Sequence, residues 1–471
     1  MNPAGTLRST TAAASPPSSA ESPAPPEQGS SGPEFPPVPD SLEATGLTAA
    51  QVRDLILKVL YQQGDRQGIE IADLVALPYQ VLDDLLMEAQ QRHFVEVLGT
   101  QGHGRSGYTY GLTAEGRQRA GTALEASRYV GPAPVTLECF DQWVRRQSVR
   151  HTRVSRDVLT GAFDDLVLTE GVIDALGPAL NSGTSIFLYG APGNGKTAIA
   201  ERMGGLVAAE VYLPNAVLVG GDVMVLYDPV YHRPADDTDV ERSGEGLLKN
   251  GPRYDRRFHR VRRPTVAVGG ELTMDQLDLQ YDPFSKVYQA PFQLKASGGV
   301  LIVDDFGRQR MRPAELLNRW IVPLEKNFDN LSLHSGIKFP VPFDCMLIFA
   351  TNLNPKDLVD EAFLRRIQFK VEVRSPDRAA FEEIMRINCR EEGVEYDPAA
   401  CDLLFDEYYD AHGLSPRGCH PRDLLLQVRS LAEFEEVPTT LTPDLLRRAA
   451  HSYFLVVEEE YQAGVPSITG P

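Results

Sequence analysis

The stretch GAPGNGKT, Gly190 to Thr197, constrains this 471-residue chain more than any other. Its glycines remove side chains from a loop whose backbone must approach a bound group closely. The spacing G-x-x-x-x-G-K-T is the phosphate-loop pattern, in which backbone N–H groups and the start of the next helix hold phosphate oxygens. The apolar run SIFLY before it and the helical pattern TAIAERM after it fit a strand, a loop and a helix. The sequence therefore predicts a site for a nucleoside triphosphate.

The phosphate-loop pattern assigns a role to each of its residues. Lys196 is expected to reach the terminal phosphates, and the Thr197 hydroxyl is expected to ligate Mg²⁺. The other loop residues expected to contact ATP are Gly190, Ala191, Pro192, Gly193, Asn194, Gly195 and Ala198. ATP and Mg²⁺ are thus the expected ligands of this segment.

Two later apolar runs end in polar side chains that suit the same site. The run GGVLIVDDFG ends in Asp304 and Asp305, and a buried parallel strand can deliver such carboxylates to magnesium at its C-terminal end. We expect Asp304 to hold the metal and Asp305 to orient the attacking water. The run CMLIFATN ends in Asn352, whose amide would reach the γ-phosphate or that water. The alternative for the acidic pair is a turn after a core strand.

Composition limits the remaining classes of protein. A net charge of −19 argues against a protein that coats nucleic acid or an anionic membrane. The cysteines are odd in number and lack C-x-x-C pairing, which fits a reducing compartment and indicates no metal site. No apolar run reaches transmembrane length, and the N-terminus has no apolar signal segment. We expect a soluble cytoplasmic protein without membrane insertion.

Composition and periodicity divide the chain into segments. The first is rich in Pro, Ser and Ala and lacks apolar periodicity, so we expect a disordered tail. The expected segments are a tail over 1–45, three helices and a hairpin over 46–125, a linker over 126–162, a nucleotide-binding core over 163–373 with an insertion at about 227–270, a helical segment over 374–460 and a tail over 461–471.

The three helices and the hairpin of residues 46–125 resemble a winged-helix (α+β) domain. The helices are expected in AAQVRDLILKVLYQQG, EIADLVAL and PYQVLDDLLMEAQQR, and the strands in FVEVLG and YTYGLT. The charged positions of the third helix are mostly acidic, with Asp83, Asp84 and Glu88 against Arg92. Carboxylates repel the phosphates that supply most DNA affinity, whereas His103 and Arg105 in the wing favour DNA. We favour docking to a protein.

A basic run, RYDRRFHRVRRP at 253–264, lies in the expected insertion. Its arginines could contact an acidic neighbouring subunit or a client protein, form a solvated rim, or bind nucleic acid. Because the whole chain is acidic, we favour the contact with a subunit or client.

The order of these parts resembles the AAA+ ATPases over residues 163–461. A helix-terminal arginine in DEAFLRRIQFKVEV and a further arginine in HPRDLLLQVRS complete the set of motifs. The resemblance implies an α/β fold, a P-loop αβα sandwich followed by a helical lid over 374–460. It also implies that Asn352 is sensor 1, that Arg366 or Arg365 is the arginine finger, and that Arg422 is sensor 2 and contacts ATP. Most of the family has Glu where Asp305 stands.

The same resemblance implies an ATP hydrolase that assembles into a ring, a hexamer, in which an arginine of one subunit completes the neighbour's site. We expect the ring to remodel or assemble a protein complex, and the alternative is a DNA-handling motor or loader that uses the winged helix. The runs ASGGVLIVDDFGRQ and ELLNRWIVPLE also resemble bacterial chaperone-like ATPases linked to Flp pilus assembly. That resemblance implies a role related to pili or secretion.

Overall fold

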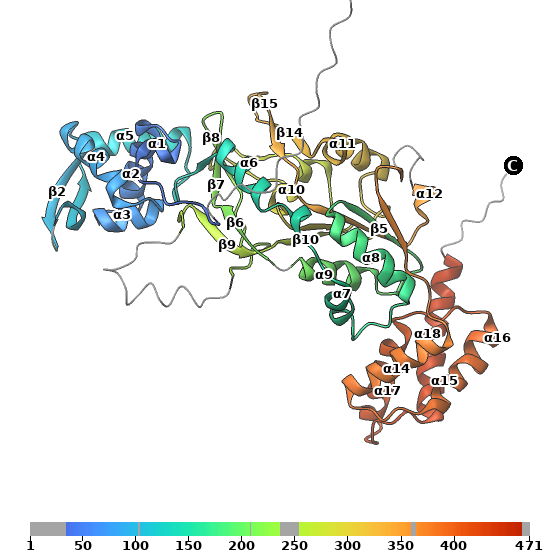
Figure 1. The fold of residues 1–471 in the computed structure, drawn as a ribbon. Coiled ribbons are helices and arrows are strands. Elements are labelled where there is room, and N and C mark those ends of the chain that lie inside the picture. Colours follow the sequence, from blue (N-terminus) through green and yellow to red (C-terminus); the bar gives the residue numbers. More distant parts are fainter. Residues whose placement is uncertain (1–33, 102–103, 208, 236–253, 359–363, 464–471) are drawn as a thin grey trace, which may run out of the picture. The chain divides into compact units, whose positions relative to one another are not determined.

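A computed structural model describes residues 34–101, 104–207, 209–235, 254–358 and 364–463 (Figure 1). The two tails expected from the sequence fall mostly outside these ranges, as do His103 of the expected wing and Arg253 of the basic run. Within the described part of the first tail, helix α1 spans Leu42–Thr45 and the side chain of Ser41 caps it. Folded structure therefore begins before residue 46, where we expected the first domain to start.

The first group of elements is helical with a small antiparallel sheet. Its helices are α2 (Ala49–Gln63), α3 (Gly68–Val75), α4 (Tyr79–Gln91) and α5 (Ala114–Ala126). Its strands are β1 (Arg66–Gln67), β2 (Val95–Thr100) and β3 (Tyr108–Leu112), in the order β1-β3-β2. The three helices and two strands expected here are confirmed, whereas β1 and α5 were not predicted.

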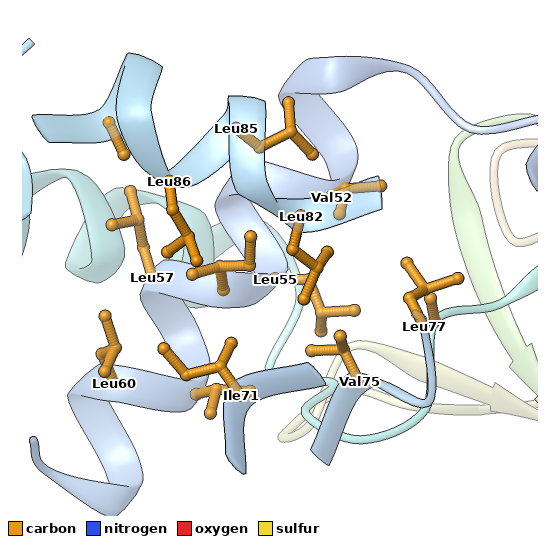
Figure 2. Packing of buried hydrophobic residues seen from close by; sticks show 14 of the residues in the cluster. Val52, Leu55, Leu57, Leu60, Ile71, Val75, Leu77, Leu82, Leu85 and Leu86 are labelled. Atoms are coloured by element: carbon orange, nitrogen blue, oxygen red, sulfur yellow. The ribbon is translucent and has the colours of Figure 1, made fainter. Parts of the chain in front are cut away.

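Apolar residues at helical spacing explain why α2, α3 and α4 form and pack. Figure 2 shows their side chains pointing toward one another, with Leu57 of α2, Ile71 of α3 and Leu86 of α4 fully buried. A capping box between Thr48 and Gln51 begins α2 and satisfies backbone groups that a helix start leaves unpaired.

The second group of elements is built on a parallel sheet. Its strands are β5 (Ser185–Tyr189), β10 (Thr265–Val268), β13 (Val300–Val303), β16 (Met346–Thr351) and β17 (Phe369–Glu372), in the order β10-β13-β16-β5-β17. Every neighbouring pair is parallel. Since both faces of such a sheet must be covered, the inner strands β5, β13 and β16 are mostly apolar, as VLIV at 300–303 illustrates.

Helices cover both faces of this sheet. One apolar cluster joins Ile186 and Ile348 to helices α7 (Arg156–Ala162), α8 (Glu170–Ser182) and α9 (Lys196–Leu206). The other joins Phe187 and Phe349 to Trp320 of helix α11 (Pro313–Lys326). Successive residues of each strand thus face opposite layers. The predicted α/β sandwich is confirmed.

A second, mixed sheet is formed by segments from several places in the chain. It has the strand order β11-β12-β8-β7-β4. The strands are β4 (Val135–Thr136), β7 (Ala216–Val219), β8 (Asp222–Val225), β11 (Gln280–Asp282) and β12 (Val287–Gln289). Two antiparallel pairs complete the strands, β6 (Glu210–Pro214) with β9 (Phe258–Arg262), and β14 (Phe328–Ser332) with β15 (Lys338–Pro342). Helix α10 (Phe292–Lys295) precedes β13.

The segment predicted as a linker, 126–162, differs from that prediction. It contains β4, helix α6 (Leu137–Arg146) and α7, and β4 pairs with β7. Phe140 of α6 is fully buried with residues of the second sheet. The prolines and glycine that suggested a linker occupy only the short turn before β4.

The predicted bounds of the insertion, 227–270, also differ from the structure. Strand β10 lies within that range, yet it is the edge strand of the parallel sheet. The extra strands begin earlier, at Glu210, and continue beyond β10 to Gln289. The insertion is therefore in two parts, one on either side of β10.

The basic run proves to be part of the folded structure, because it contains all of β9 and ends directly before β10. Arg257 is buried, pairs with buried Asp255 at 2.8 Å and donates to the Thr45 carbonyl at 3.0 Å. Arg263 donates to the Gln147 carbonyl at 2.8 Å. Two further ion pairs of the run join Arg256 to Asp73 and Arg260 to Glu210. These side chains therefore have partners within the chain.

The last group of elements is helical. It comprises α14 (Arg378–Glu392), α15 (Pro398–Leu404), α16 (Asp410–His412), α17 (His420–Phe434) and α18 (Pro443–Ala463), whereas the short helix α12 (Pro355–Leu358) comes earlier, between β16 and β17. Helices α14, α15, α17 and α18 share one apolar core, in which Phe381 and Leu424 are fully buried. We call residues 378–463 the C-terminal helical domain. In the described part of the chain, no helix has the length and apolar character needed to cross a membrane.

Candidate nucleotide site

The phosphate loop joins the end of β5 to the start of α9, as the sequence predicts. Gly195 has a φ of +81° and is the residue before the first turn of α9. A Cβ at Gly190 would lie 2.2 Å from the Val373 carbonyl oxygen, and one at Gly193 would lie 2.5 Å from Cys419 Sγ. Both positions also have positive φ, so glycine is required for conformation and for space. The start of α9 presents unpaired backbone N–H groups, which suit phosphate.

The ammonium group of Lys196 lies beneath this loop. Its Nζ donates to the carbonyls of Gly190 at 3.0 Å and Ala191 at 2.9 Å. Burial lowers the pKa of Lys196, nearby Asp304 and Asp305 oppose that shift, and the charge of Arg417 adds to it. Lys196 is thus a buried cation in the position that the loop pattern assigns to the phosphate-binding lysine.

The candidate metal ligands Thr197 and Asp304 are in direct contact. Thr197 Oγ1, in the first turn of α9, donates to Asp304 Oδ2 at 2.8 Å. Asp304 directly follows β13, and its Oδ1 accepts the backbone N–H of Asp305 at 2.9 Å. A hydroxyl and a carboxylate are hard oxygen ligands of the kind that Mg²⁺ prefers. The residues present therefore fit the expected ion.

Asn352 reaches the second aspartate from the neighbouring strand. Its Nδ2 donates to Asp305 Oδ1 at 3.2 Å. The two strand ends are tied together, because Phe306 N–H donates to the Ala350 carbonyl at 2.8 Å and Thr351 Oγ1 donates to the Phe306 carbonyl at 2.6 Å. Strand β16 lies between β5 and β13, so its C-terminal end brings Asn352 between the loop and the aspartates.

Asp305 has an unusual backbone conformation. Its φ is +47°, in the left-handed region that Asp and Asn adopt several-fold more often than other residues with a side chain. Its side chain is exposed, whereas the strand that precedes it is fully buried. This conformation offers a physical reason for aspartate where the AAA+ ATPases mostly have glutamate.

Arg422, the expected sensor 2, is placed differently from the other predicted residues. It lies in the first turn of α17 with 70% of its side chain exposed, and its guanidinium hydrogen-bonds the adjacent Asp423 at 3.0 Å. No hydrogen bond joins it to the phosphate loop among the residues that the structure describes. Arg417, which sequence reasoning missed, is the arginine beside the loop. Its Cβ lies 3.8 Å from the Cβ position of Gly193.

The two candidate finger arginines lie away from the loop of their own chain. The carbonyl of Arg366 accepts from Ser185 Oγ at 3.4 Å, and Ser185 begins the strand whose far end leads into the loop. Arg366 Nε also donates to Glu325 at 2.7 Å, and both residues line a cavity of about 180 Å³. Arg365 is exposed, and within the described residues it has no hydrogen bond or ion pair.

The comparisons with known proteins match one part of the chain to a family. Residues 377–452, from the residue that caps α14 into α18, match the family described as Domain of unknown function (DUF8689). This match covers too little of the chain to assign the whole protein to a family. No curated protein matches the chain.

Several solved structures are similar to parts of this chain. A point mutant of RuvB from Thermotoga maritima is 13% identical with a TM-score of 0.37, and the match covers 62% of this chain and 71% of that one. NtrX from Brucella abortus, in complex with ADP, is 17% identical with a TM-score of 0.35, over 61% and 56%. A chain of the BchI–BchD complex of magnesium chelatase is 17% identical with a TM-score of 0.33, over 62% and 93%. At these TM-scores, the similarities do not assign an activity.

Proposed function

We propose that the protein is an ATP hydrolase of the AAA+ type. The observation that supports this best is one row of hydrogen-bonded side chains beside the phosphate loop. Thr197 contacts Asp304, the backbone of Asp305 contacts Asp304, and Asn352 contacts Asp305. Ligands of open α/β sheets bind outside the carboxyl ends of the strands, which is where this row lies. It would place a metal ligand and a water-orienting group next to the terminal phosphate.

Each residue has a distinct part in the proposed hydrolysis. The loop backbone and Lys196 would bind the phosphates, and positioning and positive charge are the main demands of phosphoryl transfer. Asp305 would accept a hydrogen bond from the attacking water, and Asn352 would fix the orientation of that carboxylate. Thr197 and Asp304 would hold Mg²⁺, which when bound neutralises charge on the phosphate oxygens.

Comparison of ATP binding by the wild type and Lys196→Ala tests this proposal. We expect the wild type to bind ATP and release phosphate, and Lys196→Ala to lose measurable ATP binding. Lys326→Ala removes an exposed lysine from the end of α11 and is the matched control, which we expect to bind ATP like the wild type. Equal ATP affinity of Lys196→Ala and the wild type would contradict the proposal.

We also propose that the active form is a ring, most simply a hexamer, in which each site is completed by the neighbouring subunit. The finger arginines support this, since Arg366 lies beside Ser185, at the opposite end of β5 from the phosphate loop, and Arg365 is its neighbour in sequence. Arg365 is exposed and unpaired within the described residues, whereas Arg366 is held by Glu325, so Arg365 is the better candidate for a contact across the boundary. Arg417 is a better candidate than Arg422 for the sensor 2 arginine, because it lies beside the phosphate loop.

The partner that we propose is a protein complex, which the ring would remodel or assemble in the cytoplasm. Two cations of residues 46–125 are neutralised within the chain, because Arg105 pairs with Asp83 and Arg92 pairs with Glu88. Such pairs leave little positive charge for DNA phosphates. The resemblance to ATPases linked to Flp pilus assembly suggests a pilus or secretion complex. A DNA motor or loader remains the second candidate, favoured by the winged-helix resemblance of residues 46–125.

A further inference from the structure

Asn194 stands in the phosphate loop at a position where the loop pattern allows any residue, and phosphate binding there needs only the backbone. Its side chain is nevertheless buried, with a relative exposure of 9% for the residue. A buried amide is costly unless its donors and its acceptor have partners. The partners of this amide therefore indicate what the side chain does.

The donor end of the Asn194 amide contacts the chain just before the C-terminal helical domain. Its Nδ2 donates to Ser375 Oγ at 3.3 Å and lies 3.5 Å from the Val373 carbonyl oxygen. Strand β17 ends at Glu372 and helix α14 begins at Arg378. The contacts thus fall in the short connection between the parallel sheet and the helical domain.

The acceptor end of the same amide contacts a second segment of the helical domain. Asn194 Oδ1 accepts the backbone N–H of Gly418 at 3.2 Å. The next residue, Cys419, donates its backbone N–H to the Gly193 carbonyl at 2.8 Å. A Cβ on Gly418 would lie only 3.3 Å from the Gly193 carbonyl oxygen, so this approach of two backbones is close. These residues directly precede α17 and follow Arg417.

We infer that Asn194 is a positioning residue that holds the C-terminal helical domain against the phosphate loop. One amide binds both the connection into that domain and the turn before α17, and it thereby fixes Arg417 beside Lys196. Asparagine suits the task because it carries a donor and an acceptor on one rigid group, whereas aspartate has no donor. The predicted effect of Asn194 on turnover rests on the proposed function. The contacts themselves can be tested without nucleotide.

The first experiment measures hydrogen–deuterium exchange of the full chain without nucleotide. Loss of one hydrogen bond of ordinary strength corresponds to a change of about fivefold to tenfold, so Asn194→Ala should speed exchange of the Gly418 amide by about that factor. Asn194→Asp keeps the acceptor and should leave the Gly418 amide protected. The matched control is Asn388→Ala, which removes an amide that bonds the Ile384 carbonyl in its own helix. Unchanged exchange at Gly418 in Asn194→Ala would overturn the inference.

The second experiment is a double-mutant cycle with Ser375, which lies outside the phosphate loop. We expect Asn194→Ala to keep its dissociation constant for ATP within about threefold and to lower kcat by about fivefold, since backbone groups still hold the phosphates. Ser375→Ala should lower kcat less, and the double variant should equal Asn194→Ala because Ser375 acts through that amide. Multiplicative effects on kcat would overturn the inference.

The two experiments separate this inference from the proposed function. If the wild type neither binds nor hydrolyses ATP, the proposed function fails, while the exchange result still decides whether Asn194 holds the helical domain. If the wild type hydrolyses ATP and Asn194→Ala exchanges like the wild type at Gly418, the inference fails alone. Should Asn194→Ala not fold, the other two variants still test the inference. Ser375→Ala with the kcat of the wild type would contradict a role for the hydrogen bond between Asn194 and Ser375, and loss of protection at the Gly418 amide in Asn194→Asp would contradict the role of the Asn194 acceptor.

Discussion

The hydroxyl of Thr197 donates to Asp304 Oδ2 over 2.8 Å, which joins the first turn of α9 to the end of β13. Because both oxygens are expected to share one Mg²⁺, Thr197→Ala should raise the Mg²⁺ concentration needed for half-maximal turnover by about tenfold. Thr197→Ser keeps the hydroxyl and should restore most of the Mg²⁺ affinity. Phosphate release measured against Mg²⁺ concentration provides the test, and equal Mg²⁺ dependence in all three proteins would contradict the assignment.

Asp305 is expected to act in turnover and not in binding. Asp305→Asn should bind ATP with unchanged affinity and lower kcat by about 10²-fold, because it removes the carboxylate that orients and activates the water. Its melting temperature should match that of the wild type, since Asn also adopts the left-handed conformation readily.

The backbone at Asp305 gives a separate prediction for glutamate. At a φ of +47°, Asp305→Glu places a less tolerant residue in a left-handed position, which should lower the free energy of unfolding by about 1 kcal/mol. The measurement is denaturant unfolding of the Glu and Asn variants side by side. A glutamate variant that is as stable as the wild type and turns over faster would show that this conformation does not select the aspartate.

The finger arginine should act on the neighbouring subunit. Arg365→Ala should lower kcat by about 10³-fold or more, as loss of arginine fingers does elsewhere, while ATP binding persists. Mixing Arg365→Ala with Lys196→Ala should recover activity, because mixed rings contain junctions with both residues intact. The same experiment with Arg366→Ala decides between the two arginines. Absence of recovery in mixtures that co-assemble would place the arginine in its own chain's site.

The N-terminal helices should not confer DNA binding. At physiological salt, fluorescence anisotropy with a random duplex should show no binding of the full chain at micromolar concentration, since Arg105 is already paired with Asp83. Arg105→Ala and the control Arg117→Ala should then behave alike. If the wild type binds duplex in a salt-dependent way and only Arg105→Ala weakens that binding, the DNA-handling alternative is favoured.

Stability of the C-terminal helical domain should fall in mild acid because of His420. Burial lowers the pKa of His420 to about 4, and the charge of Arg417 acts in the same direction. In the unfolded chain this histidine takes up a proton near pH 6.5. Its contribution to the free energy of unfolding is therefore complete above that pH and is lost as the pH falls toward 4. Between pH 7 and pH 5 the loss from this one group should be about 2 kcal/mol.

Denaturant unfolding at the two pH values measures the effect. His420→Phe should reduce the pH dependence by that amount, although its stability at pH 7 is expected to fall through loss of the hydrogen bonds from Tyr409 Oη and the Arg417 N–H. His412→Phe, at an exposed histidine of the same domain, is the control. An identical pH dependence in all three proteins would show that His420 titrates normally.

Local patterns carried much of the prediction. The α/β fold, the loop from Gly190 to Thr197 and the polar strand ends at Asp304 and Asn352 depend on runs of fewer than about ten residues. Parallel strands bring their C-terminal ends together without further information. Helices α2, α3 and α4 could likewise be predicted from a local pattern, because their apolar periodicity is visible in the sequence.

Other features depend on tertiary contacts that no local pattern reveals. Composition suggested a linker at 126–162, but pairing of β4 with β7 gives that segment a place in a sheet. The arginines of 253–264 were predicted to be exposed and available for contacts with other molecules. Arg257 is instead buried, because Asp255 neutralises its charge. Sequence reasoning chose Arg422 and missed Arg417, because only the folded turn before α17, which begins at His420, brings Arg417 beside the phosphate loop.

The contacts of Lys196 also bear on how nucleotide would be captured. Two loop carbonyls already accept hydrogen bonds from its ammonium group, which has three N–H donors. Binding of a phosphate would therefore be a ligand exchange, in which one set of oxygens replaces another around a cation that stays in place. The free energy gained is the difference between the two sets of contacts, and none of it is offset by removal of the ammonium group from water at that step. The cation is already desolvated and oriented before the nucleotide arrives, which favours fast association.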